Sequence, residues 1–188
     1  YITIQSAVDD AQATDTVLVV EGIYSPSTNG ESFPIIMVSD INLIGVDQEL
    51  TILDAEQVDR VINIENCYNN TISDIMIIGG KTSTVGGGIY LNNSNPDLVN
   101  ITISGNMASN MGGGICLNNS NPNLINVIIT GNMAKTGGGI ALANNSIPIM
   151  INENISNNKS NIYDDIKSDI SSQPIDSLIL IEKLINTN

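Results

Sequence analysis

The sequence predicts an all-β protein, a right-handed parallel β-helix (a solenoid) of about six coils with a short N-terminal capping helix. Three observations predict this fold: an internal repeat, apolar residues that alternate with a period of two, and turn residues between the apolar runs. The segment at 86–96 returns almost unchanged at 112–122 and more loosely at 137–148. A fixed period of about 20 to 50 residues indicates an array in which each unit buries its apolar face by stacking on the next.

The repeat unit is 26 residues long, which is the spacing of Pro96, Pro122 and Pro148. Within one unit, Ile101 and Ile103 flank Thr102, and this alternation is typical of a short strand with one inward face. Glycine triplets and Asn-Ser-Asn-Pro segments, both rich in turn residues, separate the apolar runs. Because no unit shows helical spacing, helical repeats such as ankyrin are excluded, and each unit is predicted to form one coil.

Aligning the units predicts columns of equivalent residues along the solenoid axis. Four inward columns are expected: Ile75, Ile101 and Val127; Ile77, Ile103 and Ile129; Ile89, Ile115 and Ile140; and Leu91, Leu117 and Leu142. A polar column is expected at Asn100, Asn126 and Asn152, preceded by Asp74 and then Asp40. Stacked asparagines hydrogen-bond to each other and to turn backbone, so we interpret them as a turn ladder. A calcium ion bridging Asp40 and Asp74 is the alternative.

The 188 residues are predicted to form a single domain, with an N-terminal cap at 1–15, coils at 16–165 and a C-terminal cap or tail at 166–188. A helix from Ser6 to Ala13 is expected to cover the first coil with Val8 and Ala11. The apolar run at 178–185 is either a last strand or a capping helix, and we favour the cap. Deleting residues 174–188 would then expose the last coil and cause association.

Charge and composition limit the partners. The chain carries 20 acidic and 6 basic residues, a net charge of −14, and it contains no run of about 18 apolar residues. Nucleic acid is therefore not an expected partner, and insertion into a membrane is not expected. A glycan or a protein surface is the expected partner. Cys67 and Cys116 fall in different columns, so both are predicted to be free thiols.

The candidate binding residues, Tyr90, Asn92 and Asn118, lie on the repeat. Tyr90, with Cys116 and Ala141 in the following units, is expected to form a mildly apolar outer wall that could hold the face of a sugar. No histidine is present, which removes the commonest acid–base group. Glu153 occupies an inward column, and we interpret it as a sign that the stack frays there.

Several segments resemble known β-helix proteins. Residues 3–7, 15–17 and 22–24 are similar to the N-terminal cap and first coil of secreted pectin-lyase-like proteins. Residues 29–35, 41–45 and 51–55 are similar to a bacterial subgroup, the DUF1565-type domains. The segments Gly-Gly-Gly-Ile-Tyr at 86–90 and Ile-Ser-Gly-Asn at 103–106 resemble repeats of polymorphic-outer-membrane-protein-like surface proteins. The resemblance covers about residues 1–165 and implies an extracellular or cell-surface location.

The resemblance leaves several functions open, because it covers lyases, hydrolases, adhesins and inert spacers. Lyases of this kind hold calcium with clustered carboxylates and use an Arg or Lys as the base. The nearest match here is Arg60, with Asp54 and Glu56 close by in sequence, but no basic residue is placed against a carboxylate cluster. We therefore expect a scaffold for adhesion or glycan contact, without supported catalysis and without a cofactor unless calcium binds. A calcium-dependent polysaccharide lyase and a head-to-tail self-assembling filament are the alternatives.

Overall fold

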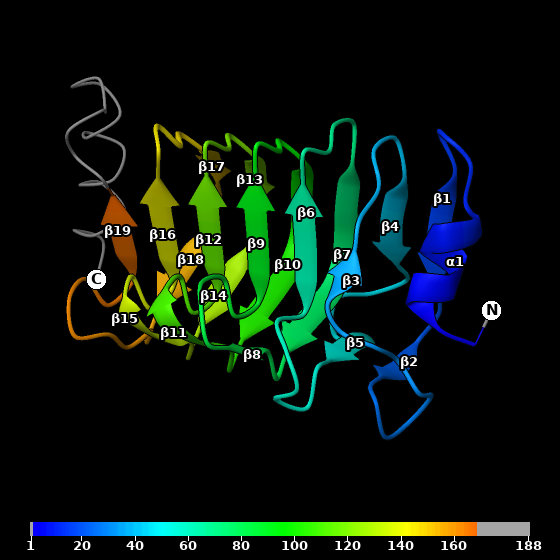
Figure 1. Cartoon of the computed structure of the whole chain (residues 1–188), viewed down its shortest axis with the longest axis horizontal. Helices are drawn as coiled ribbons and strands as arrows, with labels where there is room; N and C mark the ends of the chain where they lie inside the picture. The colour runs from blue at the N-terminus through cyan, green and yellow to red at the C-terminus, as the bar shows by residue number, and fades with distance from the viewer. Residues whose placement is uncertain (1, 169–188) are drawn as a thin grey trace.

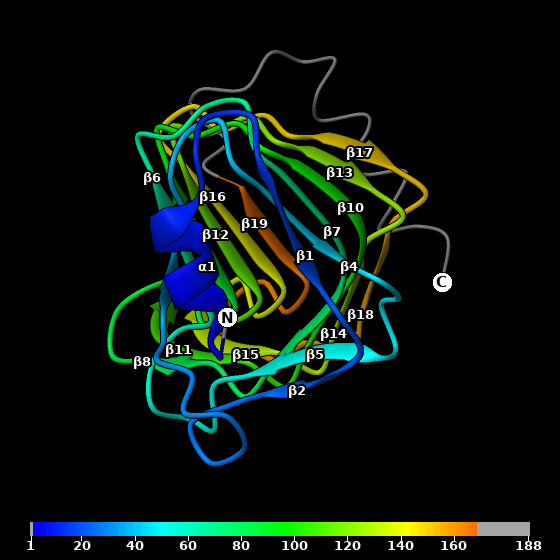
Figure 2. The same cartoon turned by 90° about the vertical axis from the view of Figure 1, so that its right-hand side faces the viewer.

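Stacked parallel strands build almost the whole molecule. The computed structural model describes residues 2–168, and these form a right-handed β-solenoid of about five turns with one short helix at the N-terminal end (Figures 1 and 2). One wall is a six-stranded parallel sheet made of β3 (Ile35–Ile36), β6 (Ile62–Glu65), β9 (Ile89–Asn92), β12 (Ile115–Asn118), β16 (Ile140–Ala143) and β19 (Ile166–Ser168). The predicted fold class is confirmed, with about five turns where the sequence predicted about six coils.

A ten-stranded sheet bends around the other side of the solenoid (Figure 2). Its main path contains β1 (Thr16–Val19), β4 (Asn42–Gly45), β7 (Thr71–Ile78), β10 (Asp97–Ser104), β13 (Asn123–Ile125) and β17 (Ile149–Ile151). Its second part contains β2 (Gly22–Tyr24), β5 (Thr51–Asp54), β14 (Ile128–Thr130) and β18 (Asn154–Ser156). Asp74 and Asn100 interrupt β7 and β10 with positive φ, so the bend falls at these residues.

A small three-stranded sheet, formed by β8 (Lys81–Thr82), β11 (Met107–Met111) and β15 (Met133–Thr136), closes the cross-section. The four predicted inward columns line the bore, and all their members are buried. Ile103 pairs in register with Ile77 on one side and Ile129 on the other. The repeat therefore produces a continuous core of Ile, Leu and Val along the axis.

The N-terminal helix, α1 (Ile4–Asp10), begins and ends earlier than predicted. Thr3, not Ser6, is its N-cap, because the Thr3 hydroxyl accepts a hydrogen bond from the Ser6 backbone N–H at 3.2 Å. The backbone becomes extended at Ala11, which ends the helix before Ala13. Val8 is buried as predicted, but Ile4, and not Ala11, is the second residue that α1 buries over the first coil.

At the other end, β19 pairs with β16, so the coils continue through Ser168 and past the predicted limit at residue 165. The apolar run at 178–185 and the segment 174–188 lie outside the described residues. Among residues 2–168, no helix is long and apolar enough to cross a membrane.

Candidate functional site

The turn asparagines form hydrogen-bonded ladders, as predicted. The side chains of Asp74, Asn100, Asn126 and Asn152 are joined from coil to coil by Nδ2–Oδ1 bonds of 3.0, 3.0 and 3.2 Å. All four have positive φ, a conformation that Asn and Asp tolerate better than other residues with a side chain. These amides bond mainly to one another, which makes this column structural.

Asp40 does not belong to that ladder, so the predicted adjacency of Asp40 and Asp74 is wrong. Asp40 Oδ1 accepts a hydrogen bond from Asn69 Nδ2 at 2.9 Å. Leu43 pairs with Ile72, a step of 29 residues instead of 26, and this shift brings Asp74 beside Gly45. Within residues 2–168, no three His, Cys, Asp or Glu residues form a group that could hold a metal ion.

A second, fully buried ladder joins Asn106, Asn132 and Asn158, and sequence reasoning missed it. Asn106 Nδ2 donates to Asn132 Oδ1 at 3.1 Å, and Asn132 Nδ2 donates to Asn158 Oδ1 at 3.0 Å. The ladder begins at the Gly80 N–H and ends at the Asp165 carboxylate. The sequence pattern that could have revealed this ladder is an Asn three residues after an inward Ile. It occurs after Ile103 and again, 26 residues later, after Ile129.

Two of the three candidate binding residues, Asn92 and Asn118, belong to a third ladder. Asn92 Nδ2 donates to Glu65 Oε2 at 3.4 Å, and Asn118 Nδ2 donates to Asn92 Oδ1 at 2.8 Å. Asn144 extends the ladder by donating to Asn118 Oδ1. Since their amides already bond along the axis, Asn92 and Asn118 have less capacity for a ligand than Tyr90.

Tyr90 lies on the predicted outer column, paired in register with Asn63 and Cys116. Cys116 and Ala141 are buried, so the predicted exposed wall does not extend over them. Cys116 is covered because the glycine turn that begins at Gly112 passes close over the outer face of β12. A Cβ added to Gly112 would lie only 2.9 Å from Cys116 Cα. Tyr90 remains half-exposed at the border of this covered region. Cys67 and Cys116 do not form a disulfide, as predicted.

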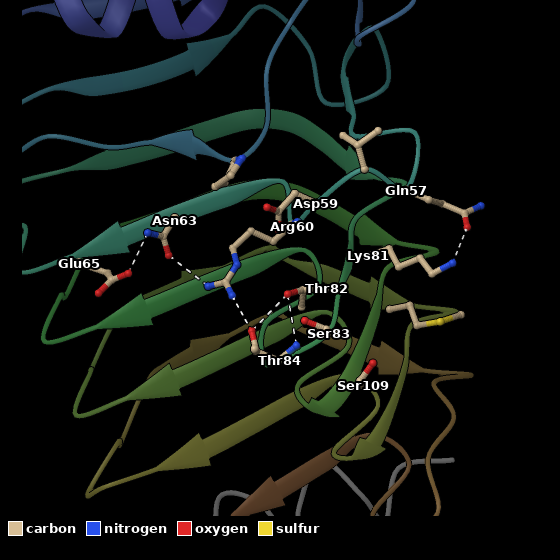
Figure 3. A pocket seen from close by; sticks show the side chains of 13 residues that line it. Gln57, Asp59, Arg60, Asn63, Glu65, Lys81, Thr82, Ser83, Thr84 and Ser109 are labelled. Carbon is tan, nitrogen blue, oxygen red and sulfur yellow. Dashed lines mark hydrogen bonds between the residues drawn. The ribbon is translucent and has the colours of Figure 1, made fainter.

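A polar groove of about 690 Å³ lies between the six-stranded wall and the β8–β11 sheet (Figure 3), and one of its lining residues, Arg60, contacts Tyr90. Arg60 lies at its centre. Its guanidinium donates to Asn63 Oδ1 at 3.2 Å and to Thr84 Oγ1 at 3.0 Å. Its Cζ lies 4.9 Å from the centroid of the Tyr90 ring, within cation–π range. These contacts fix a planar donor group in the groove.

A second cation, Lys81, enters the same groove from β8 and donates from Nζ to Gln57 Oε1 at 3.4 Å (Figure 3). Within the described part of the chain, neither Arg60 nor Lys81 forms an ion pair. Two carboxylates also line the groove: Asp59 accepts from the Arg60 backbone N–H, and Glu65 accepts from Asn63 Nδ2. The groove is therefore rich in donors and acceptors and balanced in charge.

The carboxylates that the sequence placed near Arg60 face elsewhere. Glu56 accepts hydrogen bonds from the hydroxyls of Ser27 and Ser25, and these bonds lower the pKa of its carboxyl. Asp54 Oδ1 accepts from the Glu56 backbone N–H at 2.9 Å, and both line a different hollow from Arg60. The cluster of carboxylates around a base that a lyase would use is therefore not formed by Arg60, Asp54 and Glu56.

Glu153 keeps its place in the inward column, and the stack does not fray there. Its Oε2 accepts a hydrogen bond from the Val127 N–H at 3.0 Å, and β18 continues in register directly after it. Its Oε1 is buried and has no hydrogen-bond partner among the described residues. Burial raises the pKa of Glu153 to about 7, although backbone N–H bonds at Val127 and Ile151 oppose the shift.

Comparisons with protein families, curated proteins and solved structures find no match for this chain. The likeness to secreted β-helix proteins therefore remains an expectation drawn from the sequence. The functional conclusion has to rest on the residues of the ladders and of the Arg60 groove.

Proposed function

We propose that the protein is an extracellular or cell-surface scaffold that contacts a glycan through the Arg60 groove. The observation that carries this proposal is the pair of cations, Arg60 and Lys81, that line one polar groove without an ion pair in the described residues. The chain holds only 6 basic residues, so two in one groove indicate a local function. The resemblance to secreted proteins supports the location.

The groove suits a polyhydroxylated ligand. Sugars present closely spaced hydroxyls that donate and accept, and the groove offers both kinds of partner from Asn63, Thr82 and Thr84. The Arg60 guanidinium, with its Cζ 4.9 Å from the centroid of the Tyr90 ring, offers a planar group of donors. Because Asp59 and Glu65 offset the two cations, a neutral or weakly acidic glycan is favoured over a highly charged one.

Binding without catalysis is the simpler function for this groove. Arg60 is held by Asn63, Thr84 and Tyr90, so its guanidinium is already engaged in binding contacts. A guanidinium is a donor-only group with no acceptor atom, so it suits binding better than proton abstraction. The groove residues Asp59 and Glu65 are too few for the carboxylate cluster of a calcium-dependent lyase.

The test is affinity electrophoresis through gels that contain a neutral polysaccharide (xylan or galactomannan) or polygalacturonate. We expect at least one neutral polysaccharide to retard the protein, and Arg60→Ala to weaken that retention about tenfold. Lys135→Ala is the matched control, since Lys135 is an exposed cation on β15 outside the groove. Retention that Arg60→Ala leaves unchanged would contradict the proposal. Calcium-dependent release of unsaturated uronates, lost in Arg60→Ala, would favour the lyase instead.

A further inference from the structure

The N-terminal end of the solenoid is closed on one side only (Figure 2). On that side, α1 lies over β3, and the Gln5 side chain takes the place of a neighbouring strand. Gln5 Oε1 accepts from the Ile36 N–H at 2.7 Å, and Gln5 Nε2 donates to the Ile36 carbonyl at 3.3 Å. Buried Glu31 fixes α1 by accepting hydrogen bonds from the N–H groups of Ile4 and Gln5. The edge of β3 is thus protected.

The neighbouring edge, that of β1, is open. β1 stands at the end of its sheet and pairs only with β4 within the described residues. Leu18 is 64% exposed, and Val20, directly after the strand, is 59% exposed. Edge strands are usually protected by lysine, proline or a bulge, and the β1 sequence Thr-Val-Leu-Val contains neither residue. An unprotected apolar edge favours pairing with a further strand.

A hollow of about 230 Å³ lies between this edge and α1. Its lining is mainly apolar and includes Ile2, Ile4, Ala7, Val17, Val19 and Tyr24. An open strand edge beside a helix, with an apolar hollow between them, is suited to strand addition. In that mode, backbone pairing supplies affinity and alternate side chains enter the hollow.

The acidic residues around the β1 edge determine the charge of a strand that could pair with it. Asp15 and Glu21 lie at the two ends of β1, and Asp9 and Asp10 lie in the last turn of α1; all four are exposed. Residues 1–59 contain no Lys or Arg at all. A segment with positive charges is therefore attracted to the edge, and an acidic one is repelled.

A second copy of the chain fits this end poorly. Its last described coil, residues 149–168, carries Glu153, Asp164 and Asp165 against Lys159 and Lys167, so that end has no excess of positive charge to match the acidic β1 edge. Electrostatic attraction needs complementary potentials, and a coil with a net charge of −1 supplies none to an acidic edge. The charges of the two described ends therefore favour a different protein as the occupant.

We propose that the β1 edge and the adjoining hollow dock an extended, cationic segment of another protein by strand addition. The segment alternates apolar residues, which enter the hollow and pack on the edge, with Lys or Arg residues near Asp15 and Glu21. This interaction goes beyond the proposed glycan contact, because it uses the end of the solenoid and none of the residues of the Arg60 groove.

The experiment measures binding of a fluorescein-labelled peptide, Lys-Val-Thr-Val-Lys-Val-Lys, to the full chain by fluorescence anisotropy. A peptide with Glu in place of each Lys is the charge control. We expect the cationic peptide to bind at least about tenfold more tightly than the acidic one. Leu18→Lys, which places a positive charge on the edge, and Ala7→Phe, which fills the hollow from α1, should each weaken binding about tenfold.

Ile151→Lys is the matched control, because Ile151 is exposed in the same outward column as Leu18 but lies at the other end of the solenoid. It should leave binding unchanged, and all variants should melt at wild-type temperature. Equal binding of the two peptides, or equal loss in Ile151→Lys, would overturn the proposal. Oligomers of the wild-type chain that Leu18→Lys dissolves in light scattering would also overturn it, since a second copy would then occupy the edge.

Discussion

The central coils and the first coil of this solenoid are stabilised in different ways. In the central coils, one type of contact recurs every 26 residues: the N–H of Ser94 donates to Ser120 Oγ, and the N–H of Ser120 donates to Ser146 Oγ. In the first coil, each contact occurs once, as in the carboxylate of Glu31 beneath α1. The repeat therefore stabilises the middle, and unique residues stabilise the end.

The difference follows from the position of each coil. A residue in a central coil has an equivalent neighbour on both sides, so Asn132 can donate to Asn158 and accept from Asn106. Chains of such bonds polarise one another, which strengthens a complete ladder. Within residues 2–168, the first coil has no equivalent neighbour on its outer side, so its backbone groups there bond to partners of another kind. Gln5 and Glu31 are those partners.

The largest effect is expected in the central core. Ile103→Asp should unfold the chain or lower its unfolding free energy by about 3–5 kcal/mol, because the substitution buries an unpaired charge. Thr102→Asp, one residue away and facing outward, should be tolerated. Urea denaturation of both variants measures the difference. Similar damage at the two positions would contradict the inward and outward assignment.

The two asparagine ladders should differ in energy. Asn132→Ala removes a buried amide and leaves the Asn106 N–H and the Ile103 carbonyl without partners, which should cost about 2–3 kcal/mol. Asn126→Gly, in the exposed ladder, keeps a residue that accepts positive φ and should cost less than about 1 kcal/mol. Urea midpoints compare the two, and equal losses would show that burial does not separate the ladders.

The sequence predicted the central coils far better than the ends. The columns around Ile103 follow from repetition, since aligned copies show which residues stack. The buried column of Asn106 was equally periodic, but an asparagine in a turn does not reveal whether it points into the bore or into solvent. Its burial depends on the path of the turn.

The contacts at the N-terminal end and in the Arg60 groove cannot be predicted from a single sequence. The 29-residue step between Leu43 and Ile72 moved Asp40 away from Asp74, and no repeat reveals such an insertion. Glu31 lies 27 residues from Ile4, and no local pattern predicts their hydrogen bond. The groove likewise joins Arg60 to Thr84 and Tyr90, residues from successive coils, so it becomes visible only when the coils are stacked.

A smaller and more local effect is expected at the first coil. Glu31→Ala removes the acceptor for the N–H groups of Ile4 and Gln5, which should cost about 1–2 kcal/mol. Hydrogen exchange should accelerate in α1 and β3 while β12 stays protected, because coils far from the end keep their own contacts. Glu49→Ala, an exposed carboxylate in a loop, is the control. Uniform acceleration along the solenoid would show that the cap and the central coils unfold together.

A small and pH-dependent effect is expected at Glu153, an acidic residue in an inward column of the last described coil. Its pKa is raised from an ordinary value of 4.5 to about 7, so the folded state holds its proton more tightly than the unfolded state. Its contribution to stability is therefore fully present below pH 4.5, decreases as the pH rises, and is lost once the pH passes about 7. Since the side chain is only partly buried, we expect a change of about 1 kcal/mol across this window.

Glu153→Gln isolates this contribution, because glutamine keeps an acceptor for the Val127 N–H and carries no charge at any pH. In urea denaturation, the variant should match the wild type at pH 4 and exceed its unfolding free energy at pH 8. Glu49→Gln changes the net charge equally at an exposed position, so it accounts for the general repulsion in a chain of net charge −14. If the advantage of Glu153→Gln is the same at both pH values, or no larger than that of Glu49→Gln, then the inward carboxylate is not desolvated. The last described coil would then be more open to water than the central coils.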